Sequence, residues 1–268
     1  MNLFLLYYSG AGNTQLVVSY LARELRRMGH RITTRFARKG AELPDRFEYD
    51  GLIVASPVYA YQLPQTLMKT VERLPELRSA PVFTLMTKGL ISGNAPLTLS
   101  KVISEKGGIV VGHAEITMAD TLFILTSKRN SLIEKIMLLP NMMAVREIRK
   151  LPQRVLRSFE EKVPVPFRPK IYAKLTDFIA RKFHKFVEQK VGQFYADERC
   201  DLCGACVGLC PESNIRIVDS RVLWGMDCEF CMRCVHRCPQ EAIQIGRYIR
   251  EAGRYVPPKD AYLRALLK

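Results

Sequence analysis

The chain has 268 residues and a formal net charge of +15, from 41 Lys and Arg against 26 Asp and Glu. This length suffices for a core-forming domain of ordinary size and a smaller module beside it. The longest apolar stretches have the length of strands, so we expect no transmembrane helix. The opening residues MNLFLLYYSGAGNT lack the basic start and the cleavage site of a secretory leader, so we expect a cytoplasmic protein.

Residues 1–120 alternate apolar runs with helical patterns, which predicts an α/β domain with a doubly wound, five-stranded parallel sheet. The expected strands are 3–8, 31–36, 52–55, 82–86 and 109–116. Helices are expected at 13–28, 65–73 and 96–105. In the first of them, Val17, Leu21 and Leu25 fall on one face, as a helix that covers a sheet requires.

A glycine-rich loop follows the first expected strand and leads directly into a helix. It consists of Ser9, Gly10, Ala11, Gly12, Asn13 and Thr14. Such a loop surrounds an anion with backbone N–H groups and hydroxyls at a helix N-terminus, where the helix dipole favours negative charge. It is not a dinucleotide fingerprint because the third glycine is missing, and it is not a P-loop because no Gly-Lys-Ser/Thr follows.

The string YYSGAGNT resembles the FMN phosphate loop of flavodoxins, although Ala11 replaces a hydroxyl that is common there. Two later loops match by position, and they contain Ser56, Pro57, Val58, Tyr59, Ala60 and Tyr61 after the third strand and Thr87, Lys88 and Gly89 after the fourth. In a sheet of this topology, ligands bind where the carboxyl ends of the strands meet.

The flavodoxin resemblance implies an FMN cofactor held by these three loops. It implies that Tyr59 or Tyr61 lies against the isoalloxazine and that residues 87–89 face its pyrimidine edge. Each tyrosine can also be a half-buried loop aromatic. A Lys88 ammonium near flavin N1 would favour the anionic reduced flavin, and the alternative is a solvated loop lysine.

Residues 121–197 leave this pattern and are expected to form a basic helical connecting segment. Within 121–199 there are 17 basic and 8 acidic residues. Helices are expected at 130–139, 145–161 and 169–191, with an interruption at Pro140. The last helix combines an apolar stripe with many lysines, so it can pack between domains, bind a partner or lie on an anionic membrane.

For this basic helix we favour packing between domains. Its charge would also attract an acidic redox protein such as a ferredoxin or flavodoxin. Specific nucleic-acid binding is not expected, because no recognition motif accompanies the charge.

All eight cysteines lie in the last quarter of the chain, in two runs with the spacing C-x2-C-x2-C-x3-C-P. This is the bacterial-type ferredoxin pattern, in which the fourth cysteine of each run ligates the other [4Fe-4S] cluster. The expected ligand sets are Cys200, Cys203 and Cys206 with Cys238, and Cys228, Cys231 and Cys234 with Cys210. Zinc sites usually join two C-x2-C pairs through a long spacer, and disulfides suit small secreted scaffolds, so both alternatives fit less well.

The repeat continues beyond the cysteines. With an offset of 28 residues, PESNIRI after the first run aligns with PQEAIQI after the second. Each half is therefore expected to form a cluster loop, a short helix and a strand. This resembles the small α+β fold of two-cluster ferredoxins over residues 198–268, and it implies that Ile215, Ile217, Ile243 and Ile245 pack around the clusters.

Residues 1–118 and 198–247 together resemble the flavodoxin-ferredoxin fusion proteins of anaerobic bacteria and archaea. The resemblance implies that electrons pass between two [4Fe-4S] clusters and FMN, and on to a small-molecule or protein acceptor. One hypothesis is an FMN-dependent iron-sulfur oxidoreductase, and the alternative is a non-enzymatic electron carrier or redox sensor that links protein partners. The histidines are scattered, so no catalytic acid–base residues are expected.

Overall fold

The computed structural model describes residues 1–129, 131–246, 249, 252–255 and 257. Its centre is a five-stranded parallel sheet with strand order β2-β1-β3-β4-β5. The strands are β1 (Asn2–Tyr7), β2 (Arg31–Phe36), β3 (Gly51–Pro57), β4 (Pro81–Lys88) and β5 (Ile109–Thr117). The expected α/β class and flavodoxin-like sheet are confirmed, and each predicted strand is found within two residues at either end.

The sheet is covered by helices on both faces, which explains why its strands are almost continuously apolar. All seven residues of β3, at the middle of the sheet, are buried. The helices predicted for this domain are present as α1 (Asn13–Arg27), α2 (Gln65–Glu72) and α3 (Ala95–Glu105). The connection 37–50 between β2 and β3 crosses without a helix.

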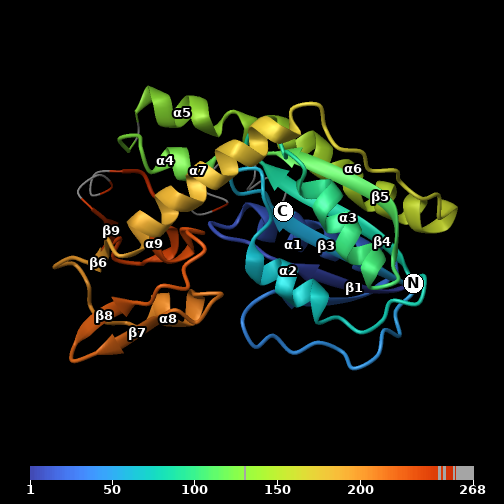
Figure 1. The fold of residues 1–268 in the computed structure, drawn as a ribbon, viewed down its shortest axis with the longest axis horizontal. Helices are drawn as coiled ribbons and strands as arrows, with labels where there is room; N and C mark the ends of the chain where they lie inside the picture. Colours follow the sequence, from blue (N-terminus) through green and yellow to red (C-terminus); the bar gives the residue numbers. More distant parts are fainter. Residues whose placement is uncertain (130, 247–248, 250–251, 256, 258–268) are drawn as a thin grey trace.

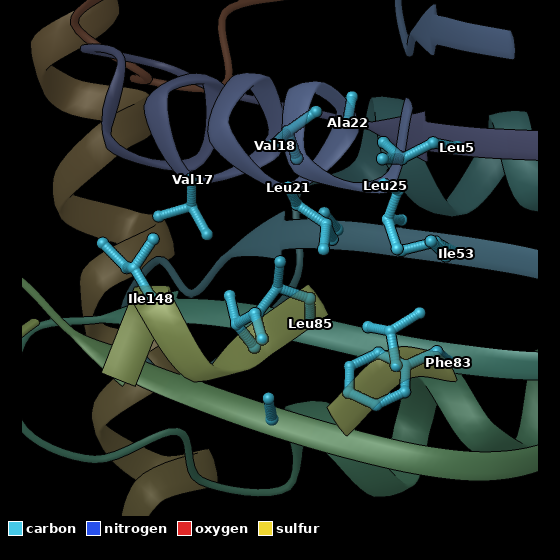
Figure 2. Close-up of a cluster of buried hydrophobic side chains, with 14 of the residues drawn as sticks. Leu5, Val17, Val18, Leu21, Ala22, Leu25, Ile53, Phe83, Leu85 and Ile148 are labelled. Atoms are coloured by element: carbon cyan, nitrogen blue, oxygen red, sulfur yellow. The ribbon is translucent and has the colours of Figure 1, made fainter. Parts of the chain in front are cut away.

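One face of the sheet is covered by α1 together with α6 (Pro140–Glu161). Figure 2 shows Leu25 of α1 beside the strand side chains Leu5 and Ile53, and Ile148 of α6 beside Val17 of α1, with Leu85 of β4 nearby. Helix α6 belongs to the segment that the sequence suggested as a connector, yet it packs on β5 and α1. The helical layer of the sheet therefore includes residues 140–161.

Two prolines mark helix α6. Pro140 interrupts the helices as predicted, since the preceding helix ends at Leu138, and α6 begins at Pro140 itself and not at 145, because the first turn needs no proline N–H. Pro152 lies inside α6 and is buried. The other helices of this region are α4 (Thr121–Ile124), which was not predicted, α5 (Leu132–Leu138) and α7 (Ala173–Val191).

The C-terminal part lies beside the sheet domain, and α7 runs from one to the other (Figure 1). It contains two antiparallel strand pairs, β6 (Phe194–Ala196) with β9 (Ile243–Ile245) and β7 (Ile215–Val218) with β8 (Arg221–Trp224). Its short helices are α8 (Ala205–Leu209) and α9 (Arg233–Arg237). Each half has the predicted order of loop, short helix and strand.

The isoleucines of this part differ in burial. Ile215, Ile243 and Ile245 lie in its apolar core with Val235 and Phe230. Ile217, however, is 38% exposed: it shares one face of β7 with the buried Ile215 but lies nearer the turn at residues 219–220, at the tip of the β7–β8 ribbon. The prediction that it packs around a cluster is therefore wrong.

Within the described residues, no helix has the length and apolar character needed to cross a membrane.

Leu21 tests the layer between α1 and the sheet. It is fully buried among Leu5, Ile53 and neighbouring side chains. Leu21→Ala should lower the free energy of unfolding by about 3 kcal/mol, because a buried leucine leaves a cavity when truncated. Ser19→Ala, on the exposed face of α1, is the control. Equal denaturant midpoints for the two variants would contradict this packing.

Candidate functional site

The glycine-rich loop forms a tight bend between β1 and α1. Gly12 precedes the helix with φ 127, a conformation that favours glycine, and no side chain caps the helix. The first turn also contains no acidic residue. Within the described part of the chain, the backbone amides of residues 11–14 have no hydrogen-bond partner. The loop therefore presents free donors at the positive end of a 15-residue helix.

The three loops expected to hold FMN meet at the carboxyl edge of the sheet. Thr14 Oγ1 and Thr87 Oγ1 are 2.8 Å apart and share a hydrogen bond, which joins the first loop to the end of β4. The Val58 amide donates to the Thr87 carbonyl at 2.9 Å, which joins the second loop to the same strand end. Residues separated by more than 70 positions thus surround one place in the fold.

The loop after β3 folds into a tight turn. Tyr59 and Gln62 exchange backbone hydrogen bonds of 2.8 and 2.9 Å. The two residues between them, Ala60 and Tyr61, have φ of 44 and 70. Ser56 is fully buried and donates to the Pro57 carbonyl at 2.7 Å. The turn places Tyr59 and Tyr61 on different sides.

The two tyrosines have different neighbours. The Tyr59 hydroxyl lies against Gly10, so that a Cβ at this glycine would overlap it. Desolvation raises the pKa of Tyr59 well above its usual value. Tyr61 lies beside Gly93 instead. Tyr59 is therefore the tyrosine that contacts the glycine-rich loop.

Lys88 is involved in a charge cluster at the ends of β4 and β5. Its Nζ donates to the Leu90 carbonyl at 2.8 Å and lies 3.5 Å from Glu115 Oε2. The Lys88 side chain is 15% exposed, so it is not a solvated lysine. Its positive charge is compensated by Glu115. Gly89 lies beside Asp120.

Glu115 is the centre of this cluster. Its Oε1 lies 3.3 Å from His113 Nε2 and accepts a hydrogen bond of 3.0 Å from Ser92. Lys170, from the segment before α7, approaches within 3.7 Å. The hydrogen bond from His113 lowers the pKa of Glu115 to about 2, together with the hydrogen bond from Ser92 and the positive charge of Lys170.

Two arginines of the second cysteine run reach the glycine-rich loop. Arg233 Nη1 donates to the carbonyls of Ser9 at 3.1 Å and Gly10 at 3.3 Å. Arg237 Nη2 donates to Gln15 Oε1 at 3.4 Å, and it would lie 2.7 Å from a Cβ at Gly12. Within the described residues, the buried Nε atoms of both arginines have no partner.

The sequence analysis did not identify these arginines. Their signal was available, since they lie four residues apart between Cys231 and Cys238 and therefore share one face of α9. Two positive charges at the positive end of a helix are unfavourable without an anion between them. Burial, followed by the charge of Arg233, lowers the pKa of Arg237.

The eight cysteines divide between two cavities in the C-terminal part. One cavity, here called the inner cavity, is lined by Cys210, Cys228, Cys231 and Cys234. The other, here called the outer cavity, is lined by Cys200, Cys203, Cys206 and Cys238. These groups coincide with the two crossed ligand sets expected from the spacing. All eight thiols are free, and within the described residues no three His, Cys, Asp or Glu side chains are placed to share one metal ion.

The two sets differ in the exposure of one cysteine each. In the inner cavity, Cys234 is 8% exposed, and desolvation raises the pKa of Cys231 to about 12 and that of Cys228 to about 11. In the outer cavity, Cys203 is exposed. The inner set thus includes a buried thiol, and the outer set includes one that reaches solvent.

No known family model and no curated protein matches the chain. Similar solved structures include flavodoxin 1 of Bacillus cereus, which is 16% identical and covers 61% of this chain and 99% of its own, with a TM-score of 0.41. A flavodoxin of Streptococcus pneumoniae TIGR4 is 16% identical, covers 61% and 100%, and has a TM-score of 0.43. A flavodoxin from the domain Archaea is 15% identical, covers 60% and 99%, and has a TM-score of 0.39. Because these TM-scores are low, no ligand or activity is transferred from these proteins.

Glu115→Gln tests the charge cluster. A carboxylate with a folded pKa of about 2 contributes stability above its unfolded pKa and loses it as the pH falls through the folded value. The variant should lose at most about 3 kcal/mol of unfolding free energy at pH 7 and clearly less at pH 3. Glu105→Gln, on the exposed end of α3, is the control. A loss that does not change between these pH values would contradict the ionic role.

Proposed function

We propose that the chain binds FMN at the three loops of the sheet edge and one [4Fe-4S] cluster in each cysteine cavity, and that it transfers electrons between them. The observation that carries this proposal is the division of eight free cysteines into two groups of four, one of them beside the glycine-rich loop. The protein acts as an electron-transfer protein or oxidoreductase that delivers electrons to a small-molecule or protein acceptor.

The cysteine groups suit clusters better than single ions. A zinc ion draws four sulfurs to about 2.3 Å from one centre, whereas a [4Fe-4S] cube spreads its four thiolates over four iron atoms. Each cavity is lined by four separate cysteines that come from both runs. The apolar neighbours Phe194, Trp224 and Ile215 of the inner cavity would exclude water from a bound cube.

The glycine-rich loop suits the phosphate of FMN. Its free amides and the dipole of α1 favour an anion. Arg237 adds a positive charge directed at Gly12. It would supply the phosphate contact that a hydroxyl at position 11 would make and that Ala11 lacks. Ser9 Oγ accepts from the Gln15 amide at 3.2 Å and thereby holds the entry to the helix.

Bound clusters would carry one electron each, and a bound flavin would hold two. The residues of the chain bind, orient and shield these groups. The hydrogen bond between Thr14 and Thr87 fixes the first loop against the third. The turn at residues 59–62 closes the edge next to Gly10. Rigid loops of this kind hold a cofactor in one orientation relative to the cysteine cavities.

The histidines favour electron transfer over acid–base chemistry. His113 is engaged with Thr84 and Glu115, and His236 is buried and accepts from the Tyr255 amide at 3.1 Å. Lysines of α7 would attract an acidic carrier such as a ferredoxin or flavodoxin. A non-enzymatic carrier or sensor that links protein partners is therefore retained as the second candidate.

The composition of the purified protein tests the proposal. Anaerobic purification should give about eight iron and eight sulfide per chain, with one FMN. Metal analysis, sulfide assay and flavin fluorescence after denaturation measure these quantities. A preparation that contains zinc without iron, or that binds no FMN when the cofactor is added, would disprove it.

Arg237→Gln tests the phosphate contact. Loss of one charge-assisted hydrogen bond should weaken FMN binding by about tenfold or more. Riboflavin, which lacks the phosphate, should bind the variant and the native protein equally. Arg216→Gln, at an exposed arginine of β7, is the matched control. Titrations that show the same FMN affinity for both variants would remove Arg237 from the site.

A further inference from the structure

The inner cavity is joined to the sheet domain by contacts on several sides. The Cys231 carbonyl lies against Gly10, so that a Cβ at this glycine would overlap it. Glu229, next to Cys228, accepts a hydrogen bond of 2.5 Å from the Thr66 amide at the start of α2. Together with the Arg233 contacts to residues 9 and 10, these contacts reach two segments of the sheet domain, the glycine-rich loop and the start of α2.

The first cysteine run also contributes to this joint. Pro211, immediately after Cys210, accepts a hydrogen bond of 2.7 Å from the amide of Lys39, in the connection that follows β2. Cys210 is the member of the first run that lines the inner cavity. The contacts with the sheet domain therefore follow the crossed cysteine sets and not the order of the two runs.

The tyrosines lie on this boundary. Cys231 packs in the apolar cluster that contains Tyr8 and Tyr59, whose ring centroids are 6.3 Å apart. Tyr59 is also the tyrosine that contacts the glycine-rich loop. Cys231, a member of the inner cysteine set, thus touches both the glycine-rich loop and the loop after β3.

The outer cavity is linked to the sheet domain less extensively, through the 3.4 Å hydrogen bond from Arg237, next to Cys238, to Gln15 of α1. Within the described residues, 200–206 make no hydrogen bond or ion pair with residues 1–120. Three residues after Cys238, Glu241 pairs with Arg129, which lies outside the sheet. Cys203 is exposed, and its neighbour Leu202 is 39% exposed. This end of the molecule is open to a partner.

We propose that the inner cysteine set, Cys210, Cys228, Cys231 and Cys234, adjoins the flavin and forms one coupled unit with the FMN site, whereas the outer set exchanges electrons with external partners. This inference rests on the proposed function. Each molecule of a one-electron reductant would give one electron at the outer set. Two such electrons, which pass through the inner set, and two protons from water would reduce one FMN fully.

Iron removal from the native protein tests the coupling without any variant. A ferrous chelator should remove iron in two phases of similar amplitude, because the outer set includes the exposed Cys203 and the inner set the buried Cys234. FMN should slow the second phase by about fivefold or more relative to FMN-depleted protein, and it should leave the first phase unchanged. FMN effects of equal size on both phases, or on neither, would overturn the inference.

Cysteine variants provide the second arm. Cys203→Ser and Cys228→Ser should each reduce the iron content by about half. Only Cys228→Ser should weaken FMN binding, because only the inner set touches Gly10 and Tyr59. If Cys228→Ser does not fold, Arg233→Gln keeps every cysteine and should still weaken FMN binding and speed the slow phase. Equal FMN affinities of Cys203→Ser, Arg233→Gln and the native protein would disprove the coupling.

These outcomes are separate from a failure of the proposed function. A chain without iron or without FMN affinity would be recognised from its composition, before any coupling is measured. A chain that binds both cofactors but shows no selective protection keeps the proposed function and loses the inner assignment.

Discussion

The two parts of the chain meet at Gly10 and Gly12, where a side chain would overlap atoms of the second cysteine run. This close approach is the constraint on which the site depends. It lets a carbonyl from the cysteine loop lie directly on the loop between β1 and α1. In such loops, glycine usually allows a ligand to approach the backbone closely. Here the same two positions also allow one protein segment to approach another.

The charged side chains at this contact have the sign that the nearby helix end disfavours. A helix N-terminus repels cations, yet two arginines from α9 are directed toward α1. Arg233 is stabilised by the carbonyls of residues 9 and 10 and by the Phe36 ring, 4.9 Å from its guanidinium. Among the residues that the structure describes, Arg237 makes a long hydrogen bond to Gln15 and no shorter one. A bound anion would compensate both the helix end and the second arginine.

The sequence predicted the parts of the structure that follow local rules. Strand and helix positions in the sheet domain followed apolar periodicity, and the cysteine groups followed a fixed spacing. Contacts between distant segments were not predictable in this way. The packing of α6 on the sheet has no local signal, because an amphipathic helix has the same sequence pattern whichever surface it packs on. The pairing of Lys88 with Glu115 has none either, because Glu115 lies in an ordinary strand pattern. The break at Pro140 was predicted, but the start of α6 at that residue was not, because a proline can both end one helix and begin the next.

The contacts that cover the glycine-rich loop join residues that lie far apart in the chain. Arg233 and Ser9 are separated by 224 positions, and Tyr255, whose hydroxyl donates to Asn13 at 2.6 Å, is separated from it by 242. During synthesis the sheet domain is completed while the second cysteine run does not yet exist. The glycine-rich loop therefore remains uncovered through most of translation, and contacts of such high contact order form last. Assembly of the molecule thus has a direction: the glycine-rich loop forms first and is covered later by the last quarter of the chain.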